Sequence, residues 1–184
     1  MRSPVKSLSR ISNPRLPVVL LIILPVSFFV SCAGGPQPAP DCSGFVLETY
    51  RRAGIDLAPF MNRYTGNGVA RLYALALDYG LLTGDDLQPG DVIFWDNTYD
   101  RNGDGVWNDP LTHTGIVTAV KADGTVEFTH SHYRDGVVVA RMDLNDPGAA
   151  ERNAAMRMRG QTSPGGLWTA GQLFRDGAAF YDLP

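Results

Sequence analysis

A cysteine opens an apolar run in the sequence Asp41-Cys42-Ser43-Gly44-Phe45-Val46. From this block onward the apolar positions recur at helical spacing, which predicts an amphipathic helix over about 43–52 that ends before Gly54. A thiol at the N-terminus of a helix lies near the positive end of the helix dipole and near unpaired N–H groups, and both favour the thiolate. The sequence therefore predicts a nucleophilic cysteine on the first turn of a helix.

Beyond this helix the pattern of apolar residues changes from helical to extended. Residues 69–81 have one apolar face at helical spacing and are expected to form a second helix. Four runs rich in β-branched and aromatic residues are expected as strands, at 92–95, 114–120, 125–129 and 137–142, with hairpin turns at 122–124 and 134–136. N-terminal helices packed on an antiparallel sheet define the α+β class. The Gly-rich tail, 160–184, is expected to cover an edge of the sheet or of the cleft.

Residues 1–32 are typical of an export signal. A basic segment precedes an apolar run at 16–30, and small residues suited to cleavage follow at 31–35. The apolar run is shorter than the about 20 residues of a spanning helix, so a signal peptide is favoured over a membrane anchor. The basic residues of the segment are Arg2, Lys6, Arg10 and Arg15.

Cys32 follows a small residue directly after the apolar run, a pattern that resembles a bacterial lipoprotein signal. Such processing would leave Cys32 lipidated at the new N-terminus and would tie the protein to the membrane. Ordinary cleavage nearby, an uncleaved anchor, and a disulfide between Cys32 and Cys42 are the alternatives. All of them place the domain outside the cytoplasm, in the periplasm or the cell envelope.

The composition, with 44% hydrophobic and 19% charged residues, is that of an ordinary globular domain. With 16 basic against 19 acidic residues and no basic patch, the sequence argues against nucleic acid as a partner. Residues 33–40 are rich in proline and are expected to form a stiff linker. Residues 41–184 are then expected to form one catalytic domain.

All three histidines lie in the half of the chain that is expected to form strands. His113 begins one predicted strand and His130 ends the next, so an antiparallel hairpin would bring them to one rim of the sheet. His132 lies two residues further, on the same face of its strand, and is the alternative neighbour. A cysteine hydrolase needs a thiolate, an imidazole that moves the proton, and a third polar group that orients the imidazole. Cys42, His113 and one of the other two histidines fit that set.

The segment before His113 carries oxygen side chains at the spacing of an EF-hand calcium loop. Asp100, Asn102, Asp104 and Asn108 stand at positions 1, 3, 5 and 9, Gly105 stands at position 6, and the carbonyl of Val106 would supply position 7. Position 12 is Leu111 in place of the usual Glu, and Asp109 or Asp96 is a candidate substitute. This pattern predicts a structural calcium site that stiffens the loop. The alternative is an acidic, turn-rich loop that needs no metal.

Four blocks of the sequence resemble, in order and in type, the NlpC/P60 cell-wall peptidases. The resemblance implies a papain-like α+β core that needs no cofactor for catalysis. It also implies Cys42 as the nucleophile, His113 as the general base and His130 as the orienting residue. The implied substrate is a peptidoglycan stem peptide, cut at an amide between D-glutamate and a diamino acid. The blocks are Asp41-Cys42-Ser43-Gly44-Phe45-Val46, Leu87-Gln88-Pro89-Gly90-Asp91-Val92-Ile93-Phe94-Trp95, His113-Thr114-Gly115-Ile116-Val117 and Phe128-Thr129-His130.

Three alternatives to an NlpC/P60 peptidase stay open, and one of them is an acyltransferase or transglutaminase-like enzyme that uses the same cysteine and histidine with an amine acceptor. The related CHAP amidases share the cysteine and both strand motifs, but they usually have an acidic residue or Asn at the position of His130. The third alternative is a catalytically inactive envelope lipoprotein that binds peptidoglycan. It is suggested by Phe28 and Phe29, which stand where the peptidase family usually has a Tyr.

Overall fold

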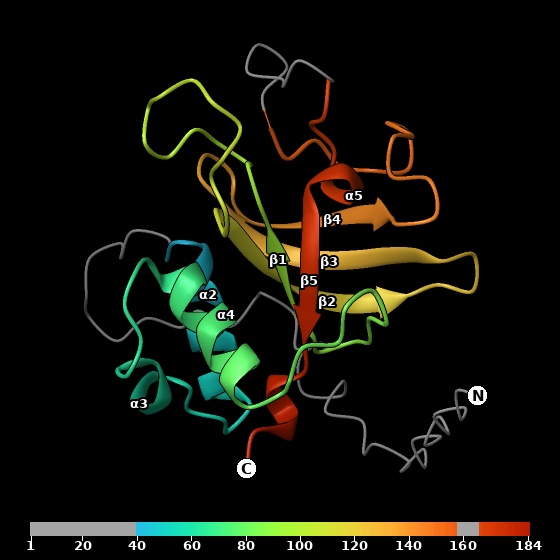
Figure 1. The fold of residues 1–184 in the computed structure, drawn as a ribbon. Coiled ribbons are helices and arrows are strands. Elements are labelled where there is room, and N and C mark those ends of the chain that lie inside the picture. The colour runs from blue at the N-terminus through green and yellow to red at the C-terminus, as the bar shows by residue number, and fades with distance from the viewer. Residues whose placement is uncertain (1–39, 158–165) are drawn as a thin grey trace, which may run out of the picture.

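The computed structural model of the chain describes residues 40–157 and 166–184. Three helices, α2, α3 and α4, lie together on one side of a five-stranded antiparallel sheet, as Figure 1 shows. The α+β class predicted from the sequence is thereby confirmed, whereas the papain-like core stays a prediction. The predicted signal peptide, most of the linker and Cys32 lie outside the described residues.

Helix α2 (Cys42–Arg52) begins at the predicted cysteine because Asp41 caps its first turn. The Asp41 carboxylate accepts hydrogen bonds from the Gly44 N–H at 2.6 Å and from the Ser43 hydroxyl at 3.0 Å. Val46 and Tyr50 point from this helix into the core. The chain then leaves the helix through Gly54, which has a left-handed φ of 88°.

Two further helices complete this layer, α3 (Ala58–Met61) and α4 (Gly68–Asp78). The short α3 was not predicted, and α4 ends before the predicted boundary of 81. Asn67 caps α4 by accepting a hydrogen bond from the Ala70 N–H at 2.8 Å. The starts of α4 and α2 touch, since a Cβ added at Gly68 would lie 2.6 Å from the Cβ of Ser43.

The sheet has the strand order β4-β3-β2-β1-β5, and every neighbouring pair is antiparallel. The expected tail segment supplies the edge strand β5, which pairs with β1 and was not predicted as a strand. A short helix, α5, precedes β5, and the 3-10 turn η2 follows it. The bounds are β1 (Val92–Trp95), β2 (His113–Val120), β3 (Thr125–His132), β4 (Gly136–Asp143), α5 (Ala170–Leu173), β5 (Phe174–Ala178) and η2 (Phe180–Asp182).

Apolar side chains fill both faces of the sheet. On one face Phe94 and Ile116 pack against the helix layer, and on the other Trp95 and Phe128 pack with residues of α5 and β4. Successive side chains of a strand alternate between faces, so the short β1 is buried on both. No helix in the described parts of the chain is long and apolar enough to cross a membrane.

Candidate active site

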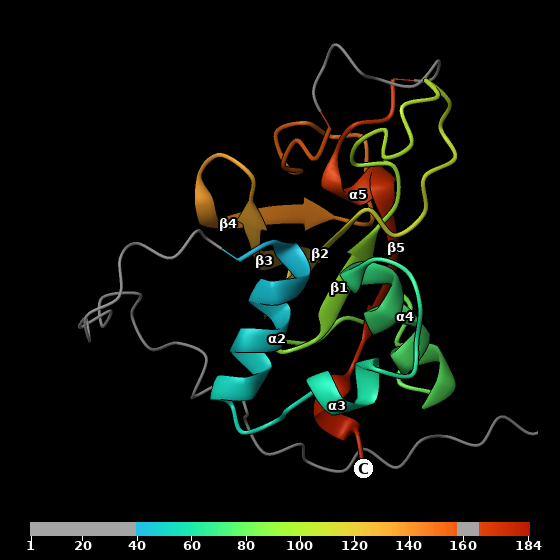
Figure 2. The ribbon, with the colours of Figure 1, turned by 90° about the vertical axis from the view of Figure 1, so that its left-hand side faces the viewer.

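Cys42 lies at the point where α2 meets the sheet. Figure 2 shows α2 beside β2 and β3, and the three elements are packed together. The Cys42 thiol is free and partly buried. The backbone of Thr114, which directly follows His113, interacts with this thiol. The fold therefore sets the cysteine against the first residues of β2.

Burial raises the pKa of the Cys42 thiol above its ordinary value. The negative charge of Asp41 acts in the same direction, while backbone groups of Thr114, Ser43 and Cys42 itself lower the pKa without cancelling the rise. The expectation that the helix N-terminus makes this cysteine a resting thiolate is wrong for the free protein. Burial removes water that would stabilise the thiolate, and this cost outweighs the stabilisation of the thiolate by the N-terminus of α2.

His113 and His130 form a hydrogen-bonded pair on adjacent strands. The Nε2 atom of His113 lies 2.8 Å from the Nδ1 atom of His130, and the rings meet edge to face with centroids 4.9 Å apart. Gly115 lies two residues after His113 in β2, and an added Cβ there would come within 3.0 Å of the His130 Cβ and 2.9 Å of the Thr129 carbonyl oxygen. The glycine of this strand motif therefore leaves room for the second histidine.

Both histidines of the pair are neutral near neutral pH. Burial, assisted by the neighbouring His130 and His132, lowers the pKa of His113 to about 3. Burial, assisted by His132, lowers the pKa of His130 to about 4. In a neutral pair one nitrogen donates and the other accepts, so the 2.8 Å contact is an ordinary imidazole–imidazole hydrogen bond.

Two aromatic rings form the wall behind the histidine pair. Trp95 is the direct neighbour of His113 in the β1–β2 register, with ring centroids 5.8 Å apart, and Phe128 lies 5.4 Å from His130. The Trp95 ring is itself fixed, since its Nε1 donates to the Ala170 carbonyl at 2.8 Å. The sequence motif contains Trp95, but nothing in the local pattern predicted that it would support His113.

His132, the alternative third residue, has a different partner. Its Nδ1 lies 2.8 Å from the carboxylate of Asp135 in the turn between β3 and β4. Its ring centroid is 6.2 Å from that of His130. The hydrogen bond of His113 goes to His130, so the geometry favours His130 over His132 as the orienting residue.

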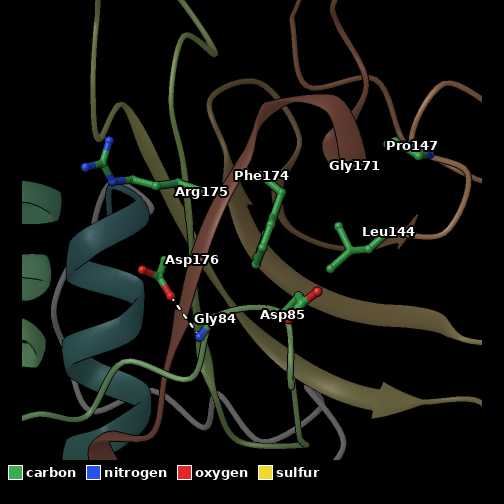
Figure 3. A pocket seen from close by; sticks show the side chains of 8 residues that line it. All are labelled: Gly84, Asp85, Leu144, Pro147, Gly171, Phe174, Arg175 and Asp176. Carbon is green, nitrogen blue, oxygen red and sulfur yellow. Dashed lines mark hydrogen bonds between the residues drawn. The ribbon is translucent and has the colours of Figure 1, made fainter. Parts of the chain in front are cut away.

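A separate open hollow of about 390 Å³ lies on another part of the molecule. Figure 3 shows residues that line it, and none of the candidate catalytic residues is among them. Two of its charged side chains are already engaged, because Asp176 accepts a hydrogen bond from the Gly84 N–H and Arg175 pairs with Asp96. This hollow therefore does not enlarge the candidate site.

Residues 33–132 match the CHAP domain family. The match covers more than half of the chain, and the protein belongs to this family. CHAP domains are relatives of the NlpC/P60 peptidases and are typically cysteine-type amidases or peptidases that act on peptidoglycan. The motifs had favoured NlpC/P60 and had placed CHAP second; the comparison identifies CHAP and gives no separate NlpC/P60 match. Neither the curated proteins nor the solved structures contained a match.

Proposed function

We propose that this protein is an exported cysteine hydrolase that cleaves amide bonds in the stem peptides of peptidoglycan. The observation that supports it most is the hydrogen-bonded pair of His113 and His130 beside the N-terminus of α2, where Cys42 stands. Membership of the CHAP family supplies the substrate class. No cofactor is needed for this chemistry.

The tautomers follow from the hydrogen bond within the pair. If the Nε2–H of His113 donates to Nδ1 of His130, then Nδ1 of His113 carries a lone pair and can act as a base. The proton of His130 then resides on its Nε2 atom. His130 acts in this arrangement as the residue that holds the ring of His113, as the third member does in other hydrolase triads.

Catalysis then starts from a neutral thiol and a neutral imidazole. The Cys42 sulfur attacks the amide carbonyl while its proton passes to His113. The carbon–nitrogen bond breaks as His113 returns that proton to the leaving amine. Water then attacks the thioester with His113 as base, which releases the acid and restores the thiol. The backbone N–H groups of Cys42 and Ser43, which already act on the sulfur, are placed to stabilise the oxyanion.

This proposal has two forms, which differ in the bond that the enzyme cuts. Resemblance to NlpC/P60 favours an endopeptidase cut between D-glutamate and the diamino acid. Membership of the CHAP family also admits an amidase cut elsewhere in the stem. The masses of the products identify the cleaved bond directly, because each cut leaves a different pair of fragments.

The test is digestion of purified muropeptides, followed by liquid chromatography and mass spectrometry. We expect hydrolysis by the protein, none by Cys42→Ala, and retained hydrolysis by His132→Asn. Hydrolysis by Cys42→Ala would exclude the assigned nucleophile. Binding to peptidoglycan without hydrolysis by the unmodified protein would support the inactive envelope protein instead.

Export and anchoring form a separate part of the proposal. We place the mature protein in the periplasm or cell envelope, with lipidated Cys32 holding it at the membrane. Support comes from the basic, apolar and small-residue segments of 1–32. The mass of the N-terminal peptide of mature protein tests it, since lipidation adds acyl chains to Cys32 and ordinary cleavage adds nothing.

A further inference from the structure

The connection between β1 and β2 has a fixed base. Asn97 and Asp109 exchange two hydrogen bonds, in which the Asn97 N–H donates to the Asp109 carbonyl and the Asp109 N–H donates to the Asn97 side chain, both at 2.8 Å. Next to them, the Thr98 N–H and hydroxyl both bond the Thr112 hydroxyl at 2.9 Å. These contacts hold both ends of the loop immediately before His113.

Beyond this base the loop is exposed and is held by its own polar side chains. The carboxylate of Asp100 accepts hydrogen bonds from the N–H groups of Gly103 and Gly105, at 2.7 and 2.8 Å. The amides of Asn102 and Asn108 both reach one carboxylate oxygen of Asp104, at 2.8 and 3.2 Å. An amide turned about its last bond presents oxygen in place of nitrogen. Oxygen ligands from these four side chains can therefore converge on one point.

Asp109 provides an independent sign of a missing ligand. Its exposed fraction is 1%, and its Oδ2 atom has no hydrogen-bond partner. The other oxygen, Oδ1, forms a long ion pair with the Nε atom of Arg101 at 3.9 Å, so the carboxylate lies next to a residue of the loop. A buried carboxylate oxygen without a partner is costly, so such groups are normally paired or coordinate a metal.

The buried cation Arg157 does not satisfy that oxygen. Arg157 lies over the ring of Trp107 at 4.1 Å and donates to the Asn97 carbonyl at 2.7 Å. In the described parts of the chain, Arg157 makes no hydrogen bond to the Asp109 Oδ2 atom, and its own Nε atom is also buried without a partner. The Oδ2 atom thus has no hydrogen-bond donor among the described residues and is available to a cation.

We propose that this loop binds a calcium ion through side-chain oxygens and one backbone carbonyl. Three carboxylates and two amides are hard oxygen donors, which suit Ca²⁺ rather than zinc. Ca²⁺ also accepts irregular geometry, whereas Mg²⁺ demands a near-ideal octahedron and dehydrates reluctantly. The proposed ligands are Asp100, Asn102, Asp104, the carbonyl of Val106, Asn108 and Asp109.

Binding must draw the loop onto Asp109. Within the described residues, no three His, Cys, Asp or Glu side chains already stand together as a metal site. Leu111 also stands where an EF-hand has its bidentate Glu. We therefore expect a dissociation constant of about 10⁻⁴ to 10⁻³ M, the range of extracellular calcium modules. Trp107, inside the loop, should change its fluorescence when the loop closes.

The experiment follows the fluorescence and thermal unfolding of the metal-stripped full chain at constant ionic strength. At a CaCl2 concentration of about 100 times the dissociation constant, we expect Tm to rise by several degrees. Magnesium at the same concentration should have a clearly smaller effect. The fluorescence change should disappear in Trp107→Phe, while the rise in Tm remains.

Two variants and one control complete the test. Asp104→Asn, at an exposed position, should fold normally and weaken calcium binding at least tenfold, and Asp109→Asn should do the same. Asp86→Asn removes an equal charge from an exposed turn elsewhere and should leave binding unchanged. The proposal would be overturned if calcium changed the Tm and fluorescence of Asp104→Asn as much as those of the unmodified protein. It would also be overturned if calcium and magnesium had equal effects on the unmodified protein, or if neither metal had an effect.

Discussion

The Nε2 atom of His113 lies 2.8 Å from the Nδ1 atom of His130, and this bond joins two imidazoles that are both neutral near neutral pH. A neutral acceptor holds the ring of His113 without adding a negative charge to the site. Because burial also raises the pKa of Cys42, the mechanism proposed above begins from the thiol form, with proton transfer accompanying attack.

The first prediction concerns the reactivity of Cys42 with iodoacetamide across pH. Because burial raises the pKa of the thiol, labelling of the native Cys32→Ala protein should become half-maximal at a higher pH than that of an ordinary thiol, whose pKa is about 8.5. The same protein in urea should label with the ordinary profile. Fast native labelling at pH 6 would instead show a resting thiolate.

Asp41 allows a matched test of one cause of that raised pKa. Asp41→Asn keeps a side chain that can cap α2 but removes the negative charge, so the pKa of Cys42 should fall. Asp41→Ala should also lower this pKa, and it should cost about 0.5–2 kcal/mol of stability through the lost cap. Labelling profiles and urea unfolding measure the two effects separately. An unchanged profile in both variants would contradict the role of the Asp41 charge.

Stability should decrease as the solution is acidified below pH 6.5. Burial lowers the pKa of His113 to about 3 and of His130 to about 4, so between these values and about 6.5 the unfolded chain binds more protons than the folded one. Each ring then contributes a loss of at most about 1.4 kcal/mol per pH unit. Urea unfolding of the protein and of His130→Asn at pH 4.5, 5.5 and 7 measures how the free energy of unfolding changes with pH. The variant should have the shallower pH dependence, and equal slopes would contradict the prediction.

Removal of His130 should lower turnover more than substrate binding. His113→Ala removes the proposed general base and should reduce kcat by about 10²- to 10⁴-fold. His130→Ala should reduce kcat by a smaller factor, since the base remains but is no longer held, with KM little changed. His132→Asn serves as the control, because His132 pairs with Asp135 rather than with His113. A larger loss in His132→Asn than in His130→Ala would reverse the assignment of the third residue.

Gly115 should tolerate no side chain. A Cβ at this position would lie 2.9 Å from the Thr129 carbonyl oxygen and 3.0 Å from the Cβ of His130. Gly115→Ala should therefore cost about 1–3 kcal/mol of stability and displace the His130 ring. Thr118→Ala in the same strand is the control. Unfolding in urea and the kcat of each variant provide the measurements, and a fully stable, fully active Gly115→Ala would refute the close packing.

The parts of the fold that the sequence predicted rest on short-range patterns. The cap at Asp41 and the helical spacing after Cys42 fix α2, and the glycine-containing turns fix the β2–β3–β4 hairpins. The strand β5 escaped prediction because its sequence, Phe-Arg-Asp-Gly-Ala, has no alternating pattern. Only its pairing with the distant β1 makes it a strand.

The same distinction holds in the candidate site. The proximity of His113 to His130 follows from hairpin geometry, which a local pattern reveals. The raised pKa of Cys42 and the support from Trp95 depend on what the folded chain packs around them, and no local pattern encodes that packing.

The position of β5 sets an order of events during synthesis. This strand lies next to β1, which carries Trp95 behind His113, yet it occupies residues 174–178 of a 184-residue chain. The edge of β1 stays unpaired until residues 174–178 have emerged from the ribosome. A nascent chain that has been synthesised only as far as β4 therefore lacks the strand that pairs with the outer edge of β1, behind His113.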